Sequence, residues 1–398
     1  MKIGSFSLIK ELNTSLILKT IREHKSISRA DIAKITGLTP ATVTNITSEL
    51  INYKIIIETK LGKSNGGRKP VLLEFNYSEY NIIGVVISRH KITVSLTDLE
   101  ANLISEKTSK ITDDITPEYA IQIIIDLIKN IIRESDKRAL GIGISMEGLI
   151  DDENGICVLS SNFGWENINI KEKIEKEFVL PVFVNNDVKA LTLGEKFYGS
   201  AKNSSDFLLL YTGYGIGASF VSGGHIYRGA SNYASEIGHT TLDINGPVCS
   251  CGNKGCFQAL ASGSALIKEI KSNGLEKYFP DGEINADKII EKHKSGVFEI
   301  TSLIEKQAFY IGVGLANIIN VFNPSLIIVN GYICKADEKI ISLIMEEVKK
   351  RSLKSMLSDV NVIFSKLSNE ESYKGATALF LSEFIENPEM FFKEYKYE

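Results

Sequence analysis

Three of the five cysteines in this chain lie within eight residues and follow a histidine at a spacing typical of a metal site. His239, Cys249, Cys251 and Cys256 form the pattern H-x9-C-x-C-x4-C, with two glycines between the last two cysteines. Glycine permits the tight backbone turns that bring thiolates together. Tetrahedral Zn²⁺ prefers such sulfur and nitrogen ligands, and four protein ligands leave no position open for a substrate. The pattern therefore predicts a structural zinc site.

Two other interpretations fit the cluster less well. Buried thiols beside a surface histidine would not require glycines at ligand spacing. A disulfide is disfavoured because we expect a cytoplasmic protein, in which thiols stay reduced. Residues 1–25 lack the apolar core of a signal peptide, and Asn and Pro interrupt the most apolar segments, so no membrane span is expected. Cys157 and Cys334 lie in apolar runs and are predicted to be small core residues.

The charge of the chain is unevenly distributed. The 398 residues are enough for two or three domains, and 43% of them are hydrophobic. Residues 1–76 hold 12 Lys and Arg against 6 Asp and Glu, whereas the remainder holds 33 against 43. A basic segment on an acidic body is typical of a protein with a polyanionic partner, although charge alone also fits a solvated basic face.

Residues 1–52 show the spacing of three short helices. Ser28 and Asp31 form a capping-box-like start for the second helix. The residues expected to face inward are Leu12, Leu16 and Ile21 in the first helix and Ile32 and Ile35 in the second. After a turn at Gly37, Thr39 is predicted to cap the third helix, with Pro40 at its first position. This order is typical of a helix-turn-helix.

The third helix has an unusual polar face. Helical spacing places Val43, Ile46 and Leu50 on its buried side. The residues expected to face outward are Thr44, Asn45 and Ser48, with Thr42 on the flank. A solvated helix face usually carries Glu and Lys, whereas hydroxyls and amides without acids suit a major groove. We predict that this face binds double-stranded DNA.

A basic loop follows the third helix. Residues 55–58 and 71–75 are predicted strands, and the glycine-rich loop between them carries Arg68 and Lys69 before Pro70. Such a loop indicates a wing that contacts phosphates or the minor groove. The alternative is a helical protein-interaction module with a basic loop, but charge, helix face and wing together favour DNA binding.

Beyond residue 81 the chain alternates strands and helices, which predicts an α/β fold with two lobes. We expect a winged helix-turn-helix at 1–76 and a first lobe at 81–196. A C-terminal helix at about 372–390 is expected to complete this lobe. The second lobe, which contains the zinc site, is expected at 197–371.

The motifs of this region resemble the ROK family, which contains bacterial sugar kinases and sugar-responsive repressors with an actin-like, two-lobed ATPase fold. The matching segments occur in family order, and they are residues 141–151, 161–165, 184–187, 213–217, 227–230 and 235–239, followed by the cysteine cluster. With the winged helix in front, the whole chain resembles a ROK-type transcriptional repressor.

The resemblance implies a set of sugar contacts. They are Asn162, Asn186, Asp187, Glu236 and His239, with Gln258 at a position where the family usually has Glu. His239 would bind zinc through one ring nitrogen and a sugar hydroxyl through the other. Asp187 corresponds to the general base of the kinases, although directly before a helix it could also serve only as an N-cap.

The resemblance also indicates that kinase activity is lost. Where the kinases have Asp-x-Gly-Gly-Thr, this chain has residues 86–90, Val-Ile-Ser-Arg-His. Tyr214 takes the usual Thr position in the second glycine loop, and Asn330-Gly331 replaces a pair of glycines. Phosphoryl transfer depends on phosphate positioning and charge neutralisation, so we expect no enzyme, with Asp187 as a vestigial base.

We therefore expect a repressor of carbohydrate-utilisation genes, in which sugar bound between the lobes changes the affinity of paired heads for an operator. A homodimer or dimer of dimers is expected. The effector candidates are xylose, glucose and an amino-sugar phosphate. Two alternatives stay open: an ATP-dependent sugar kinase with an appended DNA-binding domain, and a repressor controlled by a protein partner.

Overall fold

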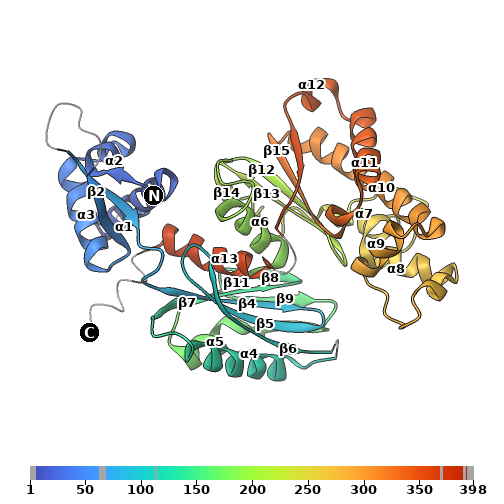
Figure 1. Cartoon of the computed structure of the whole chain (residues 1–398), viewed down its shortest axis with the longest axis horizontal. Helices are drawn as coiled ribbons and strands as arrows, with labels where there is room; N and C mark the ends of the chain where they lie inside the picture. Colours follow the sequence, from blue (N-terminus) through green and yellow to red (C-terminus); the bar gives the residue numbers. More distant parts are fainter. Residues whose placement is uncertain (1–5, 62–68, 113, 368–370, 389–390, 392–398) are drawn as a thin grey trace. The chain divides into compact units, whose positions relative to one another are not determined.

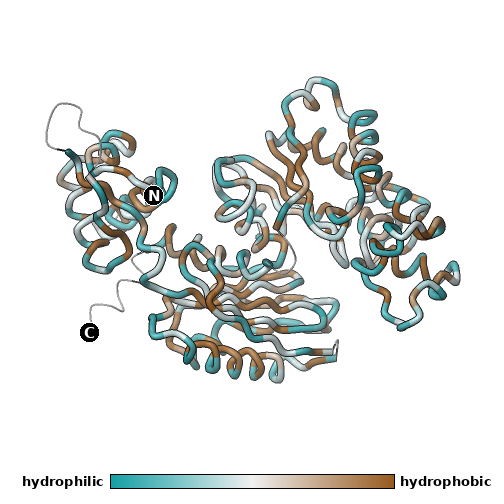
Figure 2. Tube along the Cα trace, viewed as in Figure 1, coloured by the Kyte–Doolittle hydropathy of each residue, from teal (hydrophilic) through white to brown (hydrophobic). Residues whose placement is uncertain are grey.

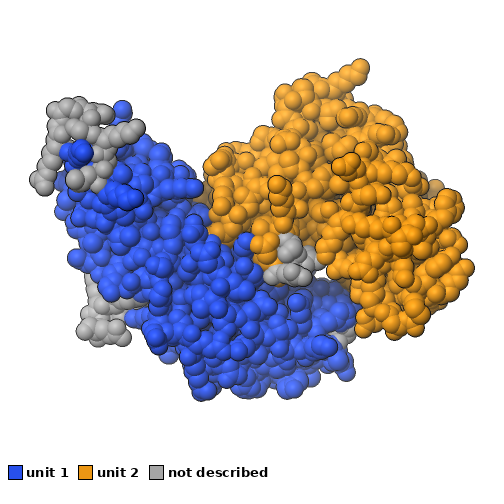
Figure 3. All heavy atoms as spheres, viewed as in Figure 1, with its two compact units in different colours: residues 1–193, 373–398 blue, residues 194–372 orange. Residues whose placement is uncertain are grey.

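The computed structural model describes residues 6–61, 69–112, 114–367, 371–388 and 391 (Figure 1). The chain forms two compact units (Figure 3). Unit 1 contains residues 1–193 and 373–398, and unit 2 contains residues 194–372. Among the described residues, every helix is too short or too polar to cross a membrane.

The first part of unit 1 is a three-helix head with a small antiparallel sheet. Its elements are α1 (Phe6–His24), β1 (Ile27–Ser28), α2 (Arg29–Thr36), α3 (Pro40–Asn52), β2 (Ile56–Leu61) and β3 (Val71–Phe75). The sheet order is β1-β3-β2. The Ser28 hydroxyl accepts from the Asp31 N–H and donates to the Asp31 carboxylate, and Thr39 caps α3 with Pro40 at its first position. Both predicted helix starts are confirmed.

The burial of the head differs in part from the sequence prediction. Ile21 and Ile32 are fully buried as expected. Leu12, Leu16 and Ile35 are exposed to 61%, 40% and 53%, so their predicted inward orientation is wrong. The inner face of α1 instead uses Ile17 and Leu18 together with Ile21. Because α1 carries apolar residues on two faces, periodicity alone could not choose the face that packs on the head.

The rest of unit 1 is built on a five-stranded mixed sheet of order β11-β7-β4-β5-β6. Its strands are β4 (Asn81–Ser88), β5 (Lys91–Thr97), β6 (Leu103–Lys110), β7 (Ala139–Met146) and β11 (Val182–Asn186). α4 (Pro117–Ile132) and α5 (Ile170–Phe178) cover one face, and α13 (Tyr373–Glu386) covers the other (Figure 1). A small sheet is formed by β8 (Leu149–Asp151), β9 (Ile156–Ser160) and β10 (Trp165–Asn169).

Unit 2 repeats the same sheet topology, with order β14-β13-β12-β15-β16. In both sheets three antiparallel strands are extended by two parallel ones. The strands are β12 (Phe207–Thr212), β13 (Ile216–Ser222), β14 (His225–Ile226), β15 (Leu326–Gly331) and β16 (Asn361–Phe364). α6 (Asp187–Phe197) begins in unit 1 and ends in unit 2. Figure 2 shows that apolar segments concentrate in the strands of both sheets.

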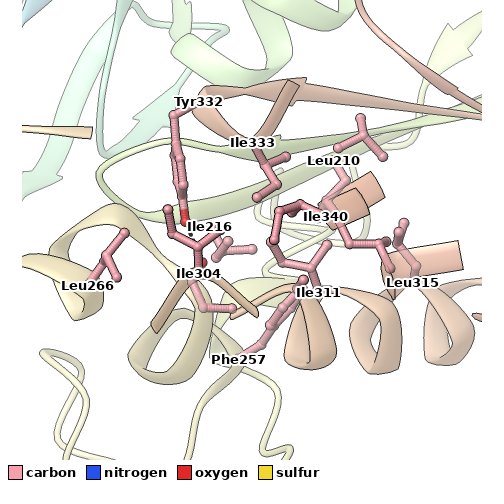
Figure 4. Close-up of a cluster of buried hydrophobic side chains, with 14 of the residues drawn as sticks. Leu210, Ile216, Phe257, Leu266, Ile304, Ile311, Leu315, Tyr332, Ile333 and Ile340 are labelled. Carbon is pink, nitrogen blue, oxygen red and sulfur yellow. Dashed lines mark hydrogen bonds between the residues drawn. The ribbon is translucent and has the colours of Figure 1, made fainter. Parts of the chain in front are cut away.

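Helices and short helical turns complete unit 2. They are η1 (Ile237–His239), α7 (Phe257–Ala261), α8 (Gly263–Ser272), η2 (Leu275–Tyr278), α9 (Ala286–Lys294), α10 (Phe298–Phe322), η3 (Tyr332–Lys335), α11 (Glu338–Arg351) and α12 (Lys354–Leu357). The core gathers side chains from α10, α7, η3 and β12, including Ile304, Phe257, Tyr332 and Leu210 (Figure 4). The predicted α/β fold is confirmed. Cys157 is buried as expected, and Cys334 is half-buried.

The contact between α13 and the sheet of unit 1 generates a stability prediction. A Cβ atom at Gly143 would lie 1.9 Å from the Ala376 carbonyl oxygen of α13, whereas one at Gly84 would have no neighbour closer than 3.3 Å. We expect Gly143→Ala to lower the free energy of unfolding by about 1–3 kcal/mol, because the strand and α13 must separate. Urea unfolding of the full chain measures this, with Gly84→Ala as the matched control. Equal stability of the two variants would contradict the packing.

Candidate functional site

The four predicted metal ligands lie together in unit 2. The ligand atoms of His239, Cys249, Cys251 and Cys256 all lie within 4.8 Å of one another. The Cys249 sulfur is 3.7 Å from the His239 Nδ1 atom, and the Cys251 and Cys256 sulfurs are 3.7 Å apart. Two sulfurs bound at about 2.3 Å to a tetrahedral Zn²⁺ are about 3.8 Å apart, whereas a disulfide would require about 2.05 Å. The group can therefore hold a metal ion.

The backbone of the cysteine loop, residues 249–256, is folded by its own hydrogen bonds. The Cys249 N–H donates to the Asn253 carbonyl at 2.7 Å, and the Gly252 N–H donates to the Cys249 carbonyl at 3.0 Å. Gly255 has φ of 65°, and a Cβ atom there would lie 1.5 Å from the Asp243 carbonyl oxygen. No other residue fits this position, because both the backbone conformation and the close contact exclude a side chain.

The residue after Cys256 anchors the loop. Phe257 is fully buried in the core of unit 2 (Figure 4). Its ring packs so closely on α10 that a Cβ atom at Gly314 would lie only 2.4 Å from the ring. The Phe257 N–H donates to the Thr240 carbonyl at 2.8 Å, next to His239. The last cysteine and the histidine are thus fixed by one aromatic side chain and one backbone bond.

The cluster gives its thiols unlike acidities. A hydrogen bond from the Asn253 N–H lowers the pKa of the exposed Cys251 to about 7. Burial raises the pKa of Cys256, because a thiolate loses its hydration there. A dication among the sulfurs would supply the missing opposite charge, so the donor set fits a metal better than three free thiols.

Gln258 connects the cysteine loop to the glycine loop, residues 213–217. Its Oε1 atom accepts from the Ile216 N–H at 3.2 Å, and its Nε2 atom donates to the Ser250 hydroxyl at 3.4 Å. A Cβ atom on Gly215 would lie 2.7 Å from this Oε1, so a side chain there would displace the Gln258 amide. The Gly213 N–H is also bonded internally, to the Gly215 carbonyl at 2.9 Å. Two N–H groups of this loop are therefore engaged within the protein.

The polar residues of unit 1 gather where its parallel strands end. The neighbouring strands β4, β7 and β11 run parallel, and both Ile87 of β4 and Asn186 of β11 lie opposite Met146 of β7. The carboxyl ends of the three strands therefore lie at the same edge of the sheet. The Glu147 carboxylate that follows β7 accepts from the Asn162 amide, and the Asn186 Nδ2 donates to the Gly148 carbonyl at 3.1 Å. Asn162 and Asn186 are thus held by one turn, residues 147–148. Sequence reasoning assigned no role to Glu147, although it lies within the matching motif.

The side chains of Asn186 and Asp187 both accept hydrogen bonds at the start of α6, and the Asp187 Oδ1 accepts from the Val188 N–H at 2.9 Å. The Asn186 Oδ1 accepts from the Val188 N–H at 2.9 Å and from the Lys189 N–H at 3.4 Å. Asp187 is the first residue of the helix and is half-buried. A carboxylate in the first turn of a helix is favoured by the helix dipole.

The six predicted sugar contacts divide equally between the units. Asn162, Asn186 and Asp187 belong to unit 1, and Glu236, His239 and Gln258 belong to unit 2. Glu236 is exposed and directly precedes η1. η1 packs closely on β13, because a Cβ atom on Gly238 would lie 2.1 Å from the Ile216 carbonyl oxygen. The exposed carboxylate of Glu236 and the ring of His239 therefore project from one short segment.

The head carries the predicted polar face on α3. Thr44, Asn45 and Ser48 are exposed, and Thr42 is half-buried. Lys69 is exposed, whereas Arg68 lies outside the described residues. Sequence reasoning missed Arg29, whose guanidinium donates to the Thr47 hydroxyl at 3.0 Å and pairs with Glu58 of β2 at 2.8 Å. Arg29 thereby fixes α3 against the first strand of the wing.

Comparison with known proteins identifies both parts of the chain. Residues 82–383 match the ROK family, and residues 12–57 match a winged helix-turn-helix DNA-binding family. The chain belongs to the ROK family. The xylose repressor of Caldicellulosiruptor bescii is 34% identical over 97% of this chain and 100% of its own length. The DNA-binding transcriptional dual regulator NagC of Escherichia coli is 28% identical over 95% of this chain and 94% of its own.

Two solved ROK structures match this chain over different shares of its length. A ROK family transcriptional regulator, a homologue of the E. coli MLC protein, matches with a TM-score of 0.84 and 26% identity over 97% of this chain and 99% of its own. A ROK glucokinase from Streptomyces griseus, solved with glucose and AMPPNP, matches with a TM-score of 0.67 and 26% identity over 75% of this chain and 98% of its own. The regulator thus matches nearly the whole chain, and the kinase matches only three-quarters of it.

The acidities within the cluster predict the order of alkylation in the reduced, metal-free protein. The lowered pKa of the exposed Cys251 raises its thiolate fraction near neutral pH, so iodoacetamide should modify it first. Cys157 should react slowly, because burial raises its pKa to about 11. Mass spectrometry of the peptides measures the order, and lowering the pH below 7 should slow the Cys251 reaction. Added Zn²⁺ should protect all three cluster thiols, and equal rates with and without it would contradict the metal site.

Proposed function

We propose that this protein is a sugar-responsive transcriptional repressor that acts in the cytoplasm as a homodimer or dimer of dimers. The observation that carries the proposal is the exposed Thr44, Asn45 and Ser48 face of α3 within a winged helix-turn-helix joined to a ROK body. The nearly full-length matches to a xylose repressor and to a DNA-binding transcriptional dual regulator support the same function. The genes under its control would be those for carbohydrate utilisation, with xylose as the first effector to test.

We propose that the group of one histidine and three cysteines holds one structural Zn²⁺. The sulfur and nitrogen donors, their separations of 3.7 Å and the tight glycine turns support this metal. With Nδ1 of His239 facing the Cys249 sulfur, the other ring nitrogen is available for a sugar hydroxyl. The metal would therefore fix both the loop and the orientation of the imidazole.

We propose that Asn162, Asn186 and Asp187 of unit 1 are sugar-binding residues, and that Glu236 and His239 of unit 2 are sugar-binding residues as well. Amides, carboxylates and an imidazole match the donor and acceptor pattern of vicinal hydroxyls. Gln258 completes the set, since its amide holds the cysteine loop that carries the metal ligands. The sugar would shift the protein toward the state with lower operator affinity, which requires a different affinity for each state.

Phosphoryl transfer is not part of this proposal. Residues 86–90 lack the acid and the glycines of a phosphate loop. In the glycine loop, the Gly213 and Ile216 N–H groups donate to protein acceptors. Since positioning and neutralisation of phosphate supply most of the catalysis of a kinase, Asp187 alone would not sustain the reaction. Control by a protein partner, with an unused sugar site, is the outcome to consider if no sugar binds.

The DNA-binding proposal predicts two kinds of loss in binding assays. Asn45→Ala should cost about 1–3 kcal/mol mainly on the cognate operator, because its amide would contact base edges. Lys69→Ala should weaken binding to all sequences and reduce the salt slope by about 1, as expected for a phosphate contact. Fluorescence anisotropy across salt concentrations measures both, with Lys294→Ala in unit 2 as a control. Intact operator binding after deletion of residues 1–76 would refute the assignment.

The metal proposal predicts one zinc per chain in the reduced native protein. Cys251→Ser should release the metal and lower both thermal stability and sugar response, because the cysteine loop depends on its ligands. Elemental analysis and differential scanning calorimetry measure these effects. Cys334→Ser, which lies outside the cluster, should keep full metal content. Absence of zinc from the unmodified protein would remove the claim.

The effector proposal predicts that sugar weakens operator binding without being phosphorylated. The coupling should be about 1–3 kcal/mol, the usual range between linked sites. Asp187→Asn and Glu236→Gln should abolish the response and leave sugar-free DNA binding unchanged, whereas Asp136→Asn should respond normally. Gel shifts across a sugar panel and an ATP-turnover assay decide between the functions. Turnover at ordinary kinase rates would establish the enzyme instead.

A further inference from the structure

The outer face of α1 is apolar although the helix already packs on the head through its inner face. Ile17, Leu18 and Ile21 are fully buried on the inner side. On the other side, Ile9, Leu12 and Leu16 are 52%, 61% and 40% exposed, and we call these three residues the outer α1 stripe. Leu8, 45% exposed, borders the stripe. Apolar side chains that lie exposed side by side on one helix mark a surface suited to a further contact.

Contacts within unit 1 fix the direction in which this stripe faces. Lys10 pairs with Glu49 of α3 at 2.7 Å, and Lys19 pairs with Glu386 of α13 at 2.7 Å. Together with the buried inner face, these pairs hold α1 against two other helices. Turning α1 to bury the stripe would expose Ile17, Leu18 and Ile21 and break both pairs. The exposure of the stripe is therefore a stable feature of the folded head.

We propose that the outer α1 stripe is the contact between two copies of the head, formed when both occupy one operator. The proposal rests on the proposed DNA-binding function. The spacing of the stripe, three and then four residues, is that of a seam between two paired helices. A two-fold contact also requires the same patch on both copies, and helix-turn-helix proteins commonly read two half-sites with two-fold symmetry.

Charge and size together favour an operator-dependent contact. Residues 1–76 carry 12 basic against 6 acidic residues, so two heads repel each other until DNA phosphates neutralise them. The stripe itself contains no charge to oppose pairing. Stable interfaces use about 20–30 residues a side, far more than this stripe supplies. The stripe therefore adds cooperativity to heads already brought together on DNA.

Other occupants fit the stripe less well. DNA phosphates and base edges require cations or hydrogen-bonding groups, which Ile9, Leu12 and Leu16 lack. A membrane-surface helix has a polar face rich in Lys and Arg. In α1 the opposite face is the buried one, and Lys10 and Lys19 are paired with acids. A second copy remains the occupant with matching chemistry.

The test compares a whole operator with half of it. The probes are a palindromic duplex selected from random sequences with the full-length protein, and a duplex that carries one half-site. Leu12→Gln/Leu16→Gln removes the stripe while keeping residues of good helix propensity. We expect its affinity for the palindrome to fall about tenfold or more, the range of a cooperative coupling, and its half-site affinity to stay unchanged.

A matched double variant and a cross-link complete the test. Leu103→Thr/Ile104→Thr removes two exposed apolar residues, 45% and 46% accessible, from β6 of the same unit and should leave both affinities unchanged. Leu12→Cys should form a cross-link between chains with a short bismaleimide on the palindrome, above the wild-type background, and not on the half-site duplex. Wild-type affinity of the stripe variant for the palindrome, an equal loss on both duplexes, or absence of the cross-link would each overturn the contact. Failure of the wild-type protein to select any duplex would instead refute the proposed DNA-binding function.

Discussion

The packing of Phe257 in the core of unit 2 fixes the backbone on which the metal-ligand group depends. The Phe257 ring packs against α10 so closely that residue 314 must be glycine. Phe257 also follows Cys256 directly along the chain. Its backbone N–H bonds to Thr240, the neighbour of His239. One buried side chain thus places two ligands that are far apart in sequence, and the short loop with its glycines places the other two. The metal ion would then stabilise a loop whose two ends are already fixed.

The glycine loop of the same unit makes hydrogen bonds within the protein. Backbone N–H groups can bind phosphate only while they have no better acceptor. Here the Ile216 N–H donates to Gln258, and the same amide reaches Ser250 in the cysteine loop. The glycine loop is therefore part of the support of the metal-ligand group. Gly215 retains a steric role in this support, since a side chain there would meet the Gln258 oxygen.

Unit 1 places its polar residues by strand topology. β4, β7 and β11 end at one edge because they are parallel neighbours in the sheet, and their following turns bring Glu147, Asn162 and Asn186 together. Ligand-binding residues commonly gather at the carboxyl ends of strands in α/β folds. In the head, Arg29 donates to Thr47 of α3 and pairs with Glu58 of β2, so one side chain links α3 to the first strand of the wing.

The sequence alone determined the features that depend on local spacing. The cysteine cluster, the capped starts of α2 and α3, the polar face of α3 and the alternation of strands and helices could all be read from it, because each depends on residues a few positions apart. Only the tertiary structure decided which face of α1 is buried and that Gln258 joins two loops. Leu12 and Leu16 show the reason. A helix with two apolar faces has the same periodicity for either orientation, and only the ion pairs and packing of the folded head select one.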